Sequence, residues 1–207
     1  MTTAPRVAVV TGAGRGMGRE VARRLTEQGW TTVITDVDEA AVRRTGHELG
    51  GCTALAHDVR DPEQHREVAR RAAALGEVRA WVNNAGVLRT GALWEQDDAT
   101  MSMTVDINLL GVVHGTRAAL TVMRAHGGRA DIVNMGSMSA YGPLPGLAVY
   151  AASKAAVVSW TQTTAAELRA AGSPVRMHVV CPDGVRTEMV AENATDRGSA
   201  MIFSGAL

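Results

Sequence analysis

The sequence predicts a three-layer, doubly wound α/β fold, in which helices cover both faces of a parallel sheet. Short apolar runs alternate with longer amphipathic segments along the 207 residues. A glycine-rich turn follows the first apolar run directly. No repeat, low-complexity tract or linker interrupts this alternation, so we expect one domain over residues 1–207.

Each element follows from a local pattern. Residues 6–11 are continuously apolar, as in a strand buried on both faces. Met17, Val21 and Leu25 then recur at helical spacing, and Gly29 closes that helix. The same alternation predicts further strands at residues 31–36, 52–59, 78–83, 131–135 and 175–181. It predicts further helices at residues 39–49, 61–75, 105–123 and 150–171.

Composition excludes several classes of function. The formal net charge is zero and 46% of the residues are hydrophobic, which gives no electrostatic basis for binding nucleic acid or an anionic membrane. No apolar stretch approaches the ~20 residues that a membrane span needs. The N-terminus shows no signal peptide, so we expect a cytoplasmic protein. The six histidines lack metal-ligand spacing, and we expect no metal site.

The turn after the first strand predicts a phosphate site. Residues 11–18 contain glycines in the pattern Gly-x-x-x-Gly-x-Gly. Such glycines allow a tight turn and close approach of a pyrophosphate, while the helix that follows offers free N–H groups and the positive end of its dipole. The expected cofactor contacts in this turn are Gly12, Arg15, Gly16, Met17 and Gly18.

Asp36 bears on which dinucleotide binds. It ends the second predicted strand, eighteen residues after Gly18, where a carboxylate accepts hydrogen bonds from the adenosine ribose and repels a 2′-phosphate. This favours NAD over NADP. Arg15 leaves NADP open, because a guanidinium in the turn can pair with that phosphate.

Tyr150 and Lys154 are a candidate acid/base pair. They stand four residues apart on one face of a predicted helix, and Lys154 is the only lysine in the chain. A nearby ammonium favours phenolate, and bringing a phenol from pH ~10 to near 7 takes roughly 4 kcal/mol. We therefore expect Lys154 to lower the pKa of Tyr150.

Together with residues 83–86 (Asn-Asn-Ala-Gly) after the fourth predicted strand, these motifs make the chain resemble a short-chain dehydrogenase/reductase of the compact, single-domain branch. The resemblance runs from residue 6 to about residue 187. It implies a Rossmann-like NAD(P)-binding domain with strand order 3-2-1-4-5-6. It also implies hydride transfer between a nicotinamide cofactor and a small-molecule secondary alcohol or ketone, in a homodimer or homotetramer.

The resemblance assigns four catalytic roles. Tyr150 would be the general acid/base, and Lys154 would tune it and bind the nicotinamide ribose. Ser137, thirteen residues before Tyr150, would hold the substrate oxygen, with Ser139 as the competing candidate. Asn108 would hold a water for proton relay, although a polar residue facing solvent from a helix is the alternative interpretation.

Further cofactor contacts are implied. Asp58 and Val59 match the pair that contacts adenine, and Thr187 matches the threonine that binds the nicotinamide amide. Asn84 falls where the chain passes the cofactor ribose, although it could instead tie strands together. The remaining implied contacts are Ala85, Gly86, Pro182 and Val185.

The chain departs from the family in two places. Residues 182–184 read Pro-Asp-Gly where relatives usually have Pro-Gly, so the turn around Val185 differs. Leu207 ends the chain where relatives continue with another helix and a seventh strand, so we expect a C-terminally truncated domain. Residues 188–207 would then form part of a substrate lid.

Three functional hypotheses follow. The first is an NAD-dependent alcohol dehydrogenase or ketoreductase that acts through Tyr150. The second is an NADP-dependent ketoreductase. The third is a non-catalytic protein that binds NAD(H) as a sensor or scaffold, for which a tuned phenol would have no purpose.

Overall fold

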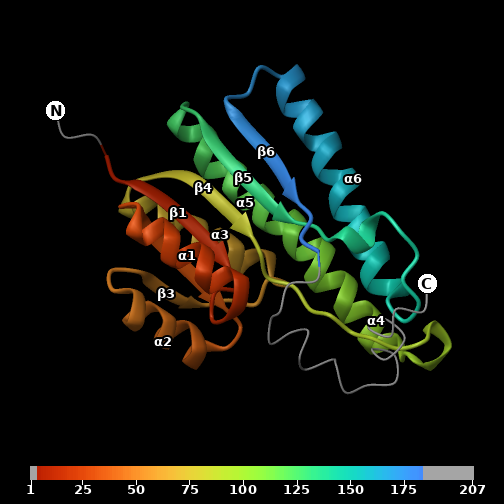
Figure 1. Ribbon diagram of the computed structural model, residues 1–207. Coiled ribbons are helices and arrows are strands. Elements are labelled where there is room, and N and C mark those ends of the chain that lie inside the picture. The colour runs from red at the N-terminus through yellow and green to blue at the C-terminus, as the bar shows by residue number, and fades with distance from the viewer. Residues whose placement is uncertain (1–3, 184–207) are drawn as a thin grey trace.

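The computed structural model describes residues 4–183. Within these residues, six parallel strands form one sheet in the order β3-β2-β1-β4-β5-β6 (Figure 1). This confirms the predicted fold class and strand order. The predicted lid segment lies outside the described residues.

The strands are β1 (Arg6–Thr11), β2 (Thr31–Asp36), β3 (Thr53–Ala56), β4 (Glu77–Asn83), β5 (Ala130–Met135) and β6 (Val175–Val180). The helices are α1 (Gly16–Glu27), α2 (Glu39–Leu49), α3 (Pro62–Leu75), α4 (Asp98–Val105), α5 (Gly111–His126) and α6 (Ala148–Ala170). Short 3-10 turns occupy Leu93–Glu95 and Met138–Ala140. None of these helices is long and apolar enough to cross a membrane.

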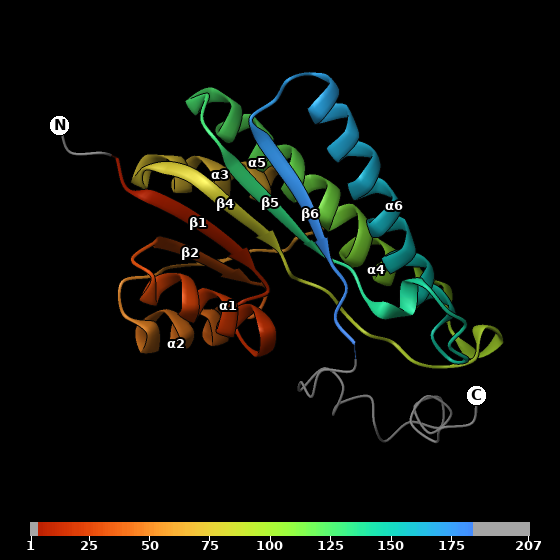
Figure 2. The ribbon, with the colours of Figure 1, turned by 45° about the horizontal axis from the view of Figure 1, so that its top comes forward.

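Helices cover the two faces of the sheet separately (Figure 2). Helices α1 and α2 pack on one face, where Ala22 and Val42 meet Val10 and Ile34 of the strands. Helices α3, α5 and α6 pack on the other face over a larger core, whose buried members include Val9, Val68, Trp81, Ala119, Met123, Ile132 and Ala165. The chain moves from β1 towards β3 in one half of the sheet and towards β6 in the other half. Right-handed crossovers in these opposite directions place their helices on opposite faces.

Two elements differ from the sequence prediction. The third strand ends at Ala56 and not at Val59. The N–H of His57 still pairs with β2, through the Asp36 carbonyl at 2.8 Å, but the N–H of Asp58 donates to Gln64 Oε1 at 2.9 Å instead. The helix expected to begin at Val105 is preceded by α4, which starts where Asp97 accepts a hydrogen bond from the N–H of Thr100 at 2.7 Å. A π-helical turn, Asp106–Leu110, joins α4 to α5.

A buried polar network fixes the carboxyl ends of the central strands. Asn83 accepts a hydrogen bond from the indole N–H of Trp81 at 2.8 Å and donates to Thr116 at 3.0 Å and Asn134 at 2.8 Å. Asn134 in turn donates to Thr161 at 2.9 Å. These bonds connect β4 and β5 with α5 and α6, so the strand ends that line the site are held at a fixed spacing.

Candidate functional site

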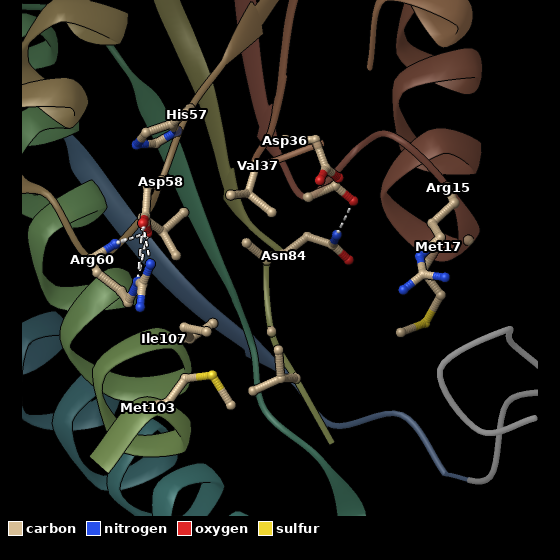
Figure 3. Close-up of a pocket in the computed structure, with 16 residues that line it drawn as sticks. Arg15, Met17, Asp36, Val37, His57, Asp58, Arg60, Asn84, Met103 and Ile107 are labelled. Atoms are coloured by element: carbon tan, nitrogen blue, oxygen red, sulfur yellow. Dashed lines mark hydrogen bonds and ion pairs between the residues drawn. The ribbon is translucent and has the colours of Figure 1, made fainter. Parts of the chain in front are cut away.

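A cavity of about 370 Å³ opens at the carboxyl ends of the strands, where the order reverses between β1 and β4 (Figure 3). Ligands of doubly wound sheets bind at this reversal. The lining residues come from the glycine turn, the ends of β2 and β3, the chain after β4, α4 and the π-helical turn: Gly12, Arg15, Gly16, Met17, Asp36, Val37, His57, Asp58, Val59, Arg60, Asn84, Ala85, Gly86, Val87, Met103 and Ile107.

The glycine turn is shaped by close backbone contacts. Gly12 and Gly16 have φ angles of 64° and 57°, which favour glycine. A Cβ on Gly18 would lie 2.2 Å from the carbonyl oxygen of Gly12, so no side chain fits there. A Cβ on Gly16 would meet nothing within 4 Å, because this residue faces the open cavity.

The amino end of α1 also faces this cavity. Its N-cap residue, Arg15, provides no capping side chain, and the first turn contains no acidic residue. The N–H groups at a helix start lack partners within the helix, and they attract anions together with the helix dipole. The turn therefore suits a phosphate group.

Asp36 is held at the edge of the glycine turn. Its Oδ2 accepts a hydrogen bond from the N–H of Gly14 at 2.9 Å, and its Oδ1 accepts one from the N–H of Asp38 at 3.1 Å. The neighbouring Val37 side chain is 72% exposed and lines the cavity. The carboxylate is thus fixed in orientation while it borders the cavity.

Asn84 holds the glycine turn through hydrogen bonds to its backbone. Its side-chain amide donates to the carbonyls of Thr11 at 2.9 Å and Gly12 at 3.0 Å. The hydroxyl of Thr11 accepts hydrogen bonds from the N–H groups of Asn84 and Ala85 at 3.0 and 3.1 Å. The side chain of Asn84 therefore ties β4 to β1, as the alternative interpretation had it, and the backbone at Ala85 and Gly86 lines the cavity.

Asp58 and Val59 form the wall opposite the glycine turn. The guanidinium of Arg60 binds the Asp58 carboxylate at 2.5 Å, and this ion pair holds the pKa of Asp58 below its usual range. Val59 is buried and packs against Gly111 at the start of α5. Arg60 was not anticipated from the sequence, although its position two residues after Asp58 was a usable signal.

Asn108 lies in the π-helical turn and is fully buried, which excludes the solvent-facing interpretation. Its Oδ1 accepts from the N–H of Val87 at 2.8 Å, and its Nδ2 donates to the Val87 carbonyl at 2.9 Å. The second Nδ2 proton faces Ser153 Oγ at 3.3 Å. The side chain therefore has no hydrogen left for a water, and it joins the chain after β4 to α6.

Ser137 and Tyr150 are brought together. Burial raises the pKa of the Tyr150 phenol, and its interaction with the Ser137 side chain acts in the opposite direction. Ser137 Oγ also accepts a hydrogen bond from the N–H of Ser139 at 3.2 Å. Ser139 Oγ itself is buried and has no hydrogen-bond partner. The geometry thus favours Ser137 over Ser139 as the partner of Tyr150.

Lys154 is 4% exposed, and its Nζ donates to the carbonyl of Met135 at 2.9 Å. Burial lowers the pKa of Lys154 to about 8. The Nζ lies 5.8 Å from the centre of the Tyr150 ring. The expectation that Lys154 makes Tyr150 acidic is therefore wrong for the chain by itself. The ammonium is directed to a carbonyl oxygen, and burial of the phenol dominates its pKa.

Of the remaining predicted cofactor contacts, some lie within the described residues and some lie outside them. The carbonyl of Pro182 accepts a hydrogen bond from the N–H of Met138 at 3.0 Å, which places the chain after β6 beside the Ser137 turn. Val185 and Thr187 lie outside the described residues. Met103, on α4, and Ile107, in the π-helical turn, also line the cavity and were not anticipated. The sequence pattern did not indicate α4.

The described residues fit a dinucleotide. Free helix N–H groups face one side, the Asp36 carboxylate borders the region expected for a ribose, and the absent side chain of Gly16 leaves the cavity open. Among residues 4–183, no three His, Cys, Asp or Glu side chains converge in a way that would hold a metal ion.

Comparison with known proteins gives one family. A family model described as short chain dehydrogenase matches residues 6–198. "Probable oxidoreductase EphD" of Mycobacterium tuberculosis is 38% identical over 187 residues, which cover 88% of this chain and 31% of that protein. The chain therefore spans about a third of the length of this relative.

Two solved structures share both fold and sequence similarity. A short chain dehydrogenase/reductase from Burkholderia phymatum, in complex with NAD, has a TM-score of 0.88 and 35% identity, and the match covers 97% of this chain and 73% of that one. An actinorhodin polyketide ketoreductase with NADPH has a TM-score of 0.86 and 33% identity, over 93% of this chain and 76% of that one.

Proposed function

Because this oxidoreductase chain belongs to the short-chain dehydrogenase family, we propose that it interconverts a secondary alcohol and a ketone with a nicotinamide cofactor. The observation that carries the proposal is the interaction of the Ser137 side chain with the Tyr150 phenol, with the buried amine of Lys154 one helical turn further along α6. This arrangement offers a proton donor and an oxygen-binding hydroxyl at one point.

The cofactor would lie along the cavity. The glycine turn and the amino end of α1 would hold its pyrophosphate, Asp36 would accept hydrogen bonds from the adenosine ribose, and the segment Asp58–Val59 would contact adenine. When bound, the nicotinamide ring accepts or gives a hydride, which is the redox chemistry that the chain's own side chains lack.

Tyr150 would carry the proton. Its raised pKa keeps the phenol protonated at neutral pH, so it is ready to donate a proton to a ketone oxygen as that oxygen gains electrons. Alcohol oxidation needs the phenolate, and this direction is therefore favoured as the pH rises. Ser137 would hold the substrate oxygen and stabilise the negative charge that develops there.

Lys154 and Asn108 would complete the proton path and the geometry. An amine with a pKa of about 8 exchanges protons readily near neutrality, so Lys154 is suited to resupply the phenol. Asn108 would act through position, since its side chain fastens the backbone at Val87 to the helix that carries Tyr150 and Lys154.

We propose NAD as the preferred cofactor. The oriented carboxylate of Asp36 would repel a 2′-phosphate, while Val37 adds no cation beside it. Arg15 is the one residue of the turn that favours NADP. Of the two similar structures, one is a complex with NAD and the other with NADPH, which leaves both cofactors as arms of the test.

The test is a panel of ketones and alcohols assayed with NADH, NADPH and their oxidised forms, with turnover read from the absorbance of the reduced nicotinamide. Reduction of a ketone with a preference for NADH is expected. Tight NADH binding without turnover on any substrate would favour the sensor hypothesis, and a preference for NADPH would contradict the assignment of Asp36.

We also propose that the protein is a homo-oligomer, as the resemblance implies for relatives that pair through the two long helices, here α5 and α6. Sedimentation at micromolar concentration should give a dimer or tetramer, and a monomer alone would contradict this.

A further inference from the structure

Three histidines gather beneath the wall of the cavity that faces the glycine turn. His57 follows β3, His65 lies on α3 and His114 lies on α5. The rings of His57 and His65 meet edge to face with centres 4.3 Å apart, and the ring of His114 lies 6.2 Å from that of His65. His57 and His65 are 2% and 0% exposed, so these two rings are buried, although His57 borders the cavity.

Two of these rings hold the segment that lines the cavity. His65 Nε2 lies 2.9 Å from the carbonyl oxygen of Val59. A carbonyl only accepts, so this nitrogen must carry a proton. His57 Nδ1 pairs with the hydroxyl of Thr35 at 2.9 Å, which fastens the start of the segment to β2. Figure 3 shows His57 beside Asp58 at the wall of the cavity.

The second nitrogen of each ring is unsatisfied. His57 Nε2, His65 Nδ1 and His114 Nδ1 are buried and have no hydrogen-bond partner. Since His65 Nε2 already carries a proton, a further proton on this ring would create a charge with nothing to receive it. The arrangement therefore accommodates the neutral form of the rings.

The charged groups around the cluster do not change this conclusion. Asp58 and Asp61 face His57 and His65 from the loop before α3, and His114 faces His65 from α5. The two carboxylates favour protonation, but burial outweighs them. It lowers the pKa of His57 to about 3 and that of His65 to about 4.

We propose that His57 and His65 are positioning residues for the cofactor, which in their neutral form hold the segment Asp58–Val59 in place to bind the adenosine end. This inference rests on the proposed function. One further tether, the hydrogen bond from the N–H of Asp58 to Gln64 Oε1 at 2.9 Å, acts on the same segment and does not titrate.

Acid should therefore release the segment. A released histidine regains an ordinary pKa near 6.5, so between about pH 7.5 and 5 the released form gains about thirtyfold over the held form for each histidine. Cofactor affinity falls as the released form becomes populated. Asp58, whose pKa is lowered by its pairing with Arg60, stays ionised over this range.

The experiment measures the Kd of NAD by calorimetry at about pH 7.5 and 5.0, with circular dichroism as the check on folding. NAD is the probe because its pyrophosphate keeps its charge over this range. His65→Gln retains an N–H donor for the Val59 carbonyl but does not titrate. His65→Leu removes the donor. Gln64→Ala removes the non-titrating tether, and His47→Gln, on the exposed face of α2, is the matched control.

We expect the Kd of the wild type and of His47→Gln to rise at least about tenfold on acidification, and that of His65→Gln to rise much less. His65→Leu should bind NAD weakly at both pH values, while Gln64→Ala should bind more weakly with an undiminished pH dependence. An equal pH dependence in the wild type and His65→Gln would overturn the proposal, whether or not His65→Leu folds. A wild type that binds no NAD at about pH 7.5 would overturn the proposed function as well.

Discussion

Replacing Lys154 by methionine should stabilise the protein while it abolishes turnover. The side chain is 4% exposed, and burial lowers its pKa from 10.5 to about 8. This difference corresponds to roughly 3 kcal/mol of unfavourable free energy for the buried charged form. The hydrogen bond to the Met135 carbonyl offsets about 1 kcal/mol of this when it is lost. We therefore expect Lys154→Met to raise the free energy of unfolding by about 2 kcal/mol near pH 7.

The pH dependence of the free energy of unfolding tests the sign of the Lys154 contribution independently. Between pH 8 and 10.5 the unfolded chain keeps the proton on Lys154 and the folded chain releases it, so wild-type stability rises with pH by about 3 kcal/mol across this window. The raised pKa of Tyr150 acts oppositely, but only above the ordinary phenol value of 10, where rising pH removes stability. Lys154→Met should lack the rise between about pH 8 and 10.

Urea unfolding of the wild type, Lys154→Met and Arg124→Met measures these changes. Arg124 is exposed on α5, so its replacement removes a positive charge without relieving a buried one. A Lys154→Met variant less stable than the wild type near pH 7, or a wild-type stability that is flat between about pH 8 and 10, would show that burial of the ammonium is not unfavourable.

Three further predictions concern residues of the candidate site. Ser139→Ala removes a buried hydroxyl without a partner, so stability should rise by up to about 1 kcal/mol with turnover kept, whereas Ser137→Ala should lose about a hundredfold in kcat; equal losses would contradict the choice of Ser137. Gly18→Ala would set a Cβ 2.2 Å from the Gly12 carbonyl, so we expect a loss of about 1–3 kcal/mol and of NAD binding, measured by denaturation and calorimetry. Gly29→Ala is its control, with strain at a φ of 77° but open space and intact binding. Asp36→Asn should shift the ratio of NADP to NAD activity upward by at least about tenfold, and an unchanged ratio would place the discrimination elsewhere.

The spacing of apolar residues in the sequence predicted most of the fold. The buried strands of a parallel sheet read as apolar runs, and β1 and β2 begin and end where those runs do. Helix α3 was equally predictable from the sequence, because Asp61 caps it and a proline follows at its first position. Local sequence was sufficient for these elements because they are regular strands and helices that pack against other regular strands and helices.

The π-helical turn around Asn108 could not be predicted from the sequence. A helical spacing of apolar residues fits α5 as well as the turn before it, and the irregularity arises from the bonds of Asn108 to the backbone of Val87, twenty-one residues earlier. A similar separation, nineteen residues, kept the sequence from indicating the hydrogen-bond partner of Lys154. Its spacing from Tyr150 indicated a phenol of lowered pKa, but the Met135 carbonyl that accepts its hydrogen bond comes from β5.

Proton transfer by Tyr150 during reduction of a ketone can be tested directly. The most direct measurement is the rate at which Tyr150→Phe oxidises bound NADH in the presence of a ketone that the wild type reduces, with the Kd of NADH determined alongside. We predict an unchanged Kd and a rate lower by at least about a hundredfold, because phenylalanine keeps the ring but has no proton to give. A Tyr150→Phe rate close to that of the wild type would show that Tyr150 does not transfer the proton.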